Sequence, residues 1–214
     1  MGQKSSSQEE DIVIASQEEV IISSSTMVHN TKRYDMLNKI ALLGDLRVGK
    51  TSLLTRFGKD SFNSYYDMTI GTDFADYIIS IDDPTHLQSE LHAKLQIWDL
   101  AGHERFRCVI KPFIRRMDGV ILCFALDDLQ SFNHIKSWLK FVRDNAADSG
   151  NSVLLVGTKS DVSERKVSES RITKFCEQTS IPYLETSSKN NIGVGEAFIR
   201  ISTMITERIR TLDY

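Results

Sequence analysis

The 214-residue chain has few cysteines, no long apolar segment and no basic stripe. Its three cysteines, Cys108, Cys123 and Cys176, lie too far apart for a zinc-binding spacing, so we expect reduced thiols in a cytoplasmic protein. The longest apolar runs, 119–126 and 153–156, fall well short of the roughly 18 residues that a membrane span needs. The polar N-terminus does not read as a secretory signal. Without a basic stripe, we expect no nucleic-acid partner.

The charge that is present is unevenly placed. The whole chain carries a formal net charge of −3, whereas residues 1–30 combine one lysine with five acids, a local charge of −4. Residues 1–35 are also rich in Ser, Gln and Glu, a composition that buries too little apolar surface to offset the entropy of ordering. We therefore predict a disordered N-terminal extension at 1–35 and one domain at 36–214.

From Met36 onward, strand-like and helix-like segments alternate. Strands are predicted at 38–44, 73–82, 91–99, 118–126, 152–157 and 182–186, and helices at 50–57, 104–116, 131–146, 168–178 and 194–211. Ser131 is the expected N-cap of the third helix. Asp82-Asp83-Pro84 is typical of a turn, so the second and third strands should form a hairpin. The pattern predicts an α/β fold: a six-stranded, mostly parallel sheet with helices on both faces and one antiparallel hairpin strand.

The segment Gly44–Thr51 fits the pattern G-x-x-x-x-G-K-[ST] between a strand and a helix. Successive backbone N–H groups of such a loop surround an anion, and the positive end of the following helix dipole points at it. Lys50 would reach the β- and γ-phosphates of a nucleotide, and the Thr51 hydroxyl would bind Mg²⁺. The predicted phosphate-binding residues are Leu46, Arg47, Val48, Gly49, Lys50, Thr51 and Ser52.

A second motif, Trp98–Glu104, follows an apolar strand. Asp99 can hold Mg²⁺ through a water molecule, and Gly102 lets its backbone N–H approach a γ-phosphate.

Two later motifs select the base. Asp161, in Thr158-Lys159-Ser160-Asp161, can accept two hydrogen bonds from guanine, whereas adenine would leave this carboxylate unpaired. This preference speaks against an ATP-dependent kinase. The stem of Lys159 can lie across the base. In the turn Ser187-Ser188-Lys189, a backbone N–H can donate to guanine O6.

These four motifs, in this order, resemble those of the small GTPases of the Ras superfamily, and residues 36–210 are closest to the Rab branch. Rab-like strings are Thr69–Phe74, Lys94–Asp99 and His103–Arg107. The resemblance implies the P-loop small GTPase fold, binding of GTP and GDP with Mg²⁺, and hydrolysis of GTP. It also implies effectors, a nucleotide exchange factor and a GAP that bind the switch regions, and a role in vesicle trafficking.

Further roles come from the resemblance alone. Thr69 would bind Mg²⁺ and the γ-phosphate, and Phe62 would pack edge-on against guanine. Residues 62–74 and 99–117 would be switch I and switch II, which the γ-phosphate orders. Thr158 stands where most members have asparagine, although the Rho branch also has threonine there.

The chain departs from the family at three positions of the catalytic site. His103 occupies the position of the glutamine that orients the attacking water, and imidazole has a different reach and one neutral acceptor nitrogen. Leu46 and Arg47 stand where small residues are common in the family. We therefore assign His103, Lys50 and Gly102 to catalysis and expect slow hydrolysis. The alternative is a GTP-held scaffold or interaction module with negligible turnover.

Membrane attachment would also differ from that of a typical Rab protein. The sequence as given has no cysteine after Cys176, so we expect no prenylation. Met1-Gly2-Gln3-Lys4-Ser5-Ser6 fits the myristoylation pattern M-G-x-x-x-[ST], which predicts peripheral membrane contact through Gly2. Such short patterns also occur by chance, so both interpretations stay open.

Overall fold

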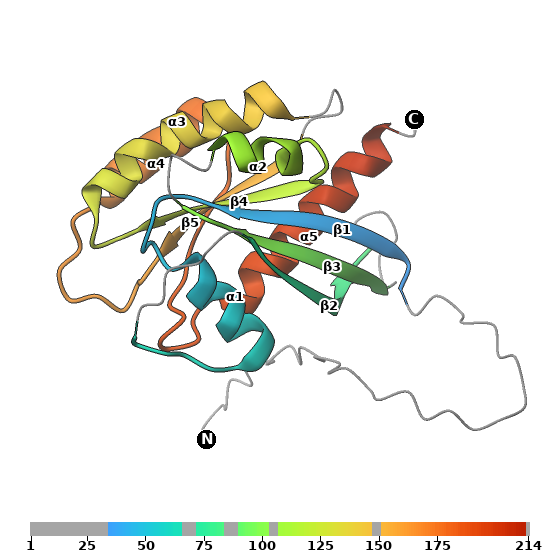
Figure 1. The fold of residues 1–214 in the computed structure, drawn as a ribbon, viewed down its shortest axis with the longest axis horizontal. Helices are drawn as coiled ribbons and strands as arrows, with labels where there is room; N and C mark the ends of the chain where they lie inside the picture. The colour runs from blue at the N-terminus through green and yellow to red at the C-terminus, as the bar shows by residue number, and fades with distance from the viewer. Residues whose placement is uncertain (1–33, 66–71, 84–89, 103–106, 147–150, 213–214) are drawn as a thin grey trace, which may run out of the picture.

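A computed structural model describes residues 34–65, 72–83, 90–102, 107–146 and 151–212. Six strands form one sheet in the order β2-β3-β1-β4-β5-β6 (Figure 1). The strands are β1 Met36–Leu43, β2 Thr72–Asp82, β3 Glu90–Leu100, β4 Gly119–Ala125, β5 Ser152–Thr158 and β6 Tyr183–Glu185. Only β2 and β3 pair antiparallel, from Thr72 opposite Leu100 to Asp82 opposite Glu90. The predicted mostly parallel sheet with one hairpin is confirmed.

Five helices pack against this sheet within the described residues (Figure 1). They are α1 Lys50–Lys59, α2 Arg107–Ile114, α3 Leu129–Asn145, α4 Glu169–Thr179 and α5 Val194–Leu212. None of them is long and apolar enough to cross a membrane.

Alternating side chains of β1 divide the core into two layers, because successive residues of a strand point to opposite faces. Ile40 and Leu42 pack with residues of α1 and α5 on one face. Ala41 and Leu43 pack with residues of α2, α3 and α4 on the other. All four side chains are fully buried, so β1 lies at the centre of both layers. The loop that follows β1 therefore starts from the buried centre of the sheet.

The predicted cap of α3 is wrong. Asp128, not Ser131, is the N-cap: its carboxylate accepts hydrogen bonds from the backbone N–H groups of Gln130 and Ser131. The Ser131 side chain instead accepts from the Ala125 N–H at 3.0 Å and donates to the Asp128 carbonyl. Both residue types favour N-caps, and the apolar spacing used for the prediction begins only at Phe132, three residues after α3 begins at Leu129. The other boundaries lie within a few residues of those predicted. The N-terminal extension up to residue 33 lies outside the described residues.

Candidate nucleotide-binding site

The carboxyl ends of β1, β3 and β5 open onto one cavity of about 550 Å³. Parallel strands of an α/β sheet place their following loops together at this edge, where such folds bind ligands. Residues that were predicted from separate motifs line the cavity together: Leu46, Arg47, Gly49, Lys50, Thr51, Ser52, Phe62, Gly102, Thr158, Lys159, Asp161, Ser188 and Lys189. Val48, Asp99 and Ser187 are buried behind this lining. Thr69 and His103 lie outside the described residues.

The phosphate-binding loop is a tight turn between β1 and α1. Gly49 has a φ of 93°, which favours glycine, and its carbonyl accepts the Leu53 N–H at 2.9 Å as α1 begins. Arg47, at φ 62°, is also left-handed, and its side chain is exposed at the mouth of the cavity. Leu46 is half-buried beside it. Two large side chains therefore stand on the part of the loop that faces the ligand.

Lys50 is a buried cation at the first position of α1. Its Nζ donates to the carbonyls of Gly44 at 3.0 Å and Asp45 at 2.8 Å. Burial lowers the pKa of Lys50, and the Asp99 carboxylate opposes this shift only in part. A polyanion in the cavity would offset the cost of burying this charge.

Gly102 passes so close to the phosphate-binding loop that only glycine fits. A Cβ atom on Gly102 would lie 2.5 Å from the Asp45 carbonyl oxygen and 2.5 Å from Lys50 Nζ. The backbone that follows β3 is therefore within reach of any group that Lys50 binds, as the Asp-x-x-Gly spacing of the second motif predicts.

Thr51 and Asp99 bring a hydroxyl and a carboxylate together at the same end of the cavity. The Thr51 hydroxyl donates to Asp99 Oδ2, and Asp99 is fully buried at the end of β3. Hard oxygen donors of this kind, few in number, suit Mg²⁺, which takes its remaining ligands from water and phosphate oxygens. The donor set therefore fits the predicted magnesium ion.

The opposite end of the cavity holds the residues predicted to contact guanine. Asp161 accepts a hydrogen bond from the Ser187 hydroxyl at 2.5 Å, which joins the loop after β5 to the loop after β6. Lys159 is left-handed at φ 60°, and its Nζ lies 3.1 Å from Asp127. The ion pair fixes the lysine stem beside the cavity.

Thr158 has a role that the sequence did not indicate. Its hydroxyl is buried and donates to the carbonyls of Val48 and Phe124, the latter at 2.9 Å. The side chain thus ties the end of β5 to the phosphate-binding loop, which positions the two halves of the site relative to each other.

Two further tethers were missed by the sequence analysis. Arg56 of α1 donates from Nε to the Ser188 carbonyl at 2.7 Å, so the phosphate-side helix supports the base-side loop. Asp45 is held by α3: Trp138 Nε1 donates to Oδ1 at 2.7 Å, and His134 Nδ1 donates to Oδ2 at 2.5 Å. The spacing of His134 and Trp138, four residues apart on one helix face, was the available signal.

The fold and the site together define a P-loop protein whose cavity is lined by Lys50 at one motif and by Asp161, the carboxylate predicted to bind guanine, at another. The model of the Ras family matches residues 39–207. The GTP-binding protein ypt1 of Schizosaccharomyces pombe is 41% identical over 177 residues, 82% of this chain and 83% of that protein. The Ras-related protein RABD2b of Arabidopsis thaliana is 41% identical over 177 residues, 82% of this chain and 84% of that protein. The Ras-related protein SEC4 of Saccharomyces cerevisiae is 39% identical over 180 residues, 84% of this chain and 80% of that protein. The chain belongs to the Ras family, as a small GTPase of the Rab branch.

Proposed function

We propose that this protein is a Rab-like guanine-nucleotide switch that binds GTP and GDP with Mg²⁺ and hydrolyses GTP slowly. The observation that carries the proposal is the single cavity lined at one end by Lys50 and Thr51 and at the other by Asp161. A guanine nucleotide needs both ends at once: cations and N–H groups for the phosphates, and a carboxylate for the base.

Each end has a separate task in the proposed reaction. Lys50 stabilises charge on the phosphates, and the Gly102 N–H binds the γ-phosphate. Thr51, Asp99 and Thr69 would hold Mg²⁺, which when bound neutralises charge that develops on the phosphate oxygens. Asp161 and the N–H groups of 187–189 orient guanine, and Phe62 packs against it.

We propose slow hydrolysis because of three residues assigned to the phosphate end of the cavity: His103, Leu46 and Arg47. Imidazole at His103 does not reproduce the amide that orients the attacking water, and Leu46 crowds the space that a partner's arginine would enter. A barrier raised by about 1.4 kcal/mol already slows hydrolysis tenfold. Arg47, which is exposed and lines the cavity, either adds a cation beside the phosphates, or points to solvent or pairs with an acid of a switch segment.

A single-turnover assay tests the proposed hydrolysis. Protein loaded with GTP is mixed with Mg²⁺, and GDP is measured over hours for the wild type and His103→Gln. We expect at least about tenfold faster hydrolysis in the variant, equivalent to about 1.4 kcal/mol of barrier. His92→Gln, which makes the same change at an exposed position on β3, is the matched control and should leave the rate unchanged. Equal rates in all three proteins would remove the role assigned to His103.

The second candidate function is a GTP-held interaction module, and Leu46 and Arg47 at the cavity mouth favour it. The nucleotide retained by purified protein separates the two functions. GDP indicates a cycling switch, whereas GTP that persists through the single-turnover assay indicates the module.

Trafficking of vesicles and contact with the cytoplasmic faces of membranes follow from the Rab resemblance. Effectors, an exchange factor and a GAP would read residues 62–74 and 99–117. Myristate on Gly2 would give only marginal membrane binding, so a protein partner would have to supply a second contact. Intact mass of protein from a eukaryotic host checks the modification, and an unmodified Gly2 would exclude it.

A further inference from the structure

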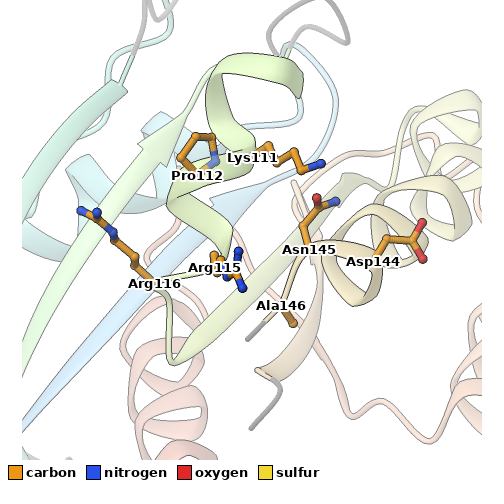
Figure 2. A pocket seen from close by; sticks show the side chains of 7 residues that line it. All are labelled: Lys111, Pro112, Arg115, Arg116, Asp144, Asn145 and Ala146. Atoms are coloured by element: carbon orange, nitrogen blue, oxygen red, sulfur yellow. The ribbon is translucent and has the colours of Figure 1, made fainter. Parts of the chain in front are cut away.

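A shallow cavity lined by basic side chains, here called the basic hollow, lies at the C-terminal ends of α2 and α3, away from the nucleotide-binding cavity. It has a volume of about 540 Å³ and is lined by Lys111, Pro112, Arg115, Arg116, Asp144, Asn145 and Ala146. Lys111 and Arg115 project from α2 and the following turn toward the end of α3 (Figure 2). The three cations are exposed, and none has an ion pair with a carboxylate of the described residues.

Asp144, the carboxylate among the described residues that line the hollow, does not cancel the hollow's charge. Both oxygens of Asp144 accept hydrogen bonds from Lys140 Nζ, at 3.2 Å and 2.9 Å, so this acid already has a cation of its own. The Asn145 amide donates to the Phe141 carbonyl at 2.7 Å. Lys111 and Arg115 therefore face the end of α3, whereas Arg116 lines the hollow but extends away from that helix (Figure 2). Among the described lining residues, no carboxylate is left there without a cation. Such a surface attracts an acidic segment.

The chain carries an acidic segment of its own, in the extension that precedes Tyr34 and β1 in the sequence. Asp118, two residues after Arg116, donates its N–H to the Lys39 carbonyl and accepts the Lys39 N–H at 2.8 Å. Lys39 is in the first half of β1, which begins at Met36. The residues before β1 therefore enter the fold on the side of the sheet where α2 ends.

Length and charge both allow the extension to reach the hollow. Fourteen residues lie between Glu19 and Tyr34, so fifteen Cα–Cα steps join the two and span up to about 50 Å at roughly 3.3 Å per step. Residues 9–19 hold all five acids of the first 30 residues, Glu9, Glu10, Asp11, Glu18 and Glu19, and no lysine or arginine. Because both groups belong to one chain, their association is intramolecular, which raises the effective concentration far above that of a free peptide.

We propose that residues 9–19 of the N-terminal extension dock in the basic hollow formed by Lys111, Arg115 and Arg116. This docking goes beyond the proposed nucleotide switch, because it gives the extension a site on the fold. It places an acidic segment on α2, which lies within the predicted switch II, residues 99–117. The docked extension then covers part of the surface through which an acidic partner would bind α2.

Zero-length crosslinking of the full-length protein tests the docking. A carbodiimide joins a carboxylate to an amine only when the two are in contact, and Lys111 is the only amine side chain among the described residues that line the hollow. Mass spectrometry of the monomer should find residues 9–19 linked to Lys111. The double variant Arg115→Glu/Arg116→Glu should reduce this product at least about fivefold, since it replaces two attractions by two repulsions.

The matched control is Arg171→Glu/Lys174→Glu. It makes the same change in net charge at two exposed positions of α4, away from the hollow, and should keep the Lys111 product. Thermal melting of both double variants verifies that each is folded. For the wild-type protein, the yield of the Lys111 crosslink should also decrease as the salt concentration rises from 0.01 M to 1 M. The reason is that the electrostatic screening length falls from about 30 Å to about 3 Å.

Three results would overturn the proposal. The acids of 9–19 could link to Lys174 as often as to Lys111, the yield could be insensitive to salt and to the Arg115/Arg116 reversal, or links could join only different chains. Mixing ¹⁴N- and ¹⁵N-labelled protein distinguishes links within a chain from links between chains. The last result would assign the hollow to a second copy.

Discussion

Asp161 is the side chain that we expect to decide between guanine and adenine. It lines the cavity and is oriented by the Ser187 hydroxyl at 2.5 Å. Two hydrogen bonds from guanine to a carboxylate contribute about 3 kcal/mol or more. We expect Asp161→Ala to raise the Kd for GDP at least about 100-fold, without improving ADP binding. Calorimetric titration measures both affinities. Asp144→Ala, outside the cavity, is the control, and an equal loss there would contradict the assignment.

Lys50 carries a charge that the nucleotide-free fold tolerates poorly. Burial lowers its folded-state pKa below the ordinary 10.5, so the unfolded chain binds more protons at this residue between the lowered pKa and pH 10.5. The contribution of Lys50 to stability therefore increases as pH rises through that range. Lys50→Met removes this contribution, so its stability relative to the wild type should fall with rising pH.

Urea unfolding of nucleotide-free protein at a series of alkaline pH values measures the difference between the two proteins. Groups whose shift does not involve Lys50, such as Cys176, whose pKa is raised by burial, titrate in both proteins and cancel in the comparison. Lys59→Met, at the exposed end of α1, is the control and should run parallel to the wild type. A constant difference between Lys50→Met and the wild type across this range would contradict the burial argument.

At the scale of the elements, α3 binds the phosphate-binding loop directly through two side-chain hydrogen bonds. Both oxygens of Asp45 are bound from this helix, by Trp138 and His134, while the Asp45 carbonyl accepts from Lys50. Removing the His134 contact costs about 1 kcal/mol at a partly exposed site. We expect His134→Ala to release GDP about fivefold faster, with little change in hydrolysis once GTP is bound. Fluorescent-nucleotide release measures the rate, and Lys136→Ala on the same helix should leave it unchanged.

The elements themselves were predictable because their signals are local. Apolar periodicity and turn residues located all eleven helices and strands of the described fold, and the Gly44–Thr51 and Thr158–Asp161 motifs located both ends of the cavity. Contacts between distant segments were not predictable from the same signals. The bond from His134 to Asp45 spans 89 residues and that from Arg56 to Ser188 spans 132. Whether such side chains meet depends on how helices pack on the sheet, which no local pattern encodes.

At the scale of the whole molecule, nucleotide binding and folding stability are coupled. The cavity is built from loops that follow β1, β3, β5 and β6, so an occupant contacts segments from Leu46 to Lys189 at once. A ligand that binds only the folded state at 100 times its Kd stabilises by about 2.7 kcal/mol. For a domain of this size that is a rise in Tm of about 5–10 °C.

Thermal unfolding of protein stripped with EDTA and then given Mg²⁺ with GDP or ADP measures this coupling. The rise should occur with GDP and not with ADP, because the adenine ring cannot satisfy Asp161. Asp161→Ala should retain the nucleotide-free Tm and lose the rise, which separates lost recognition of the base from a damaged fold. Equal shifts with both nucleotides would mean that the phosphates alone hold the ligand, and the guanine site would then have to be reassigned.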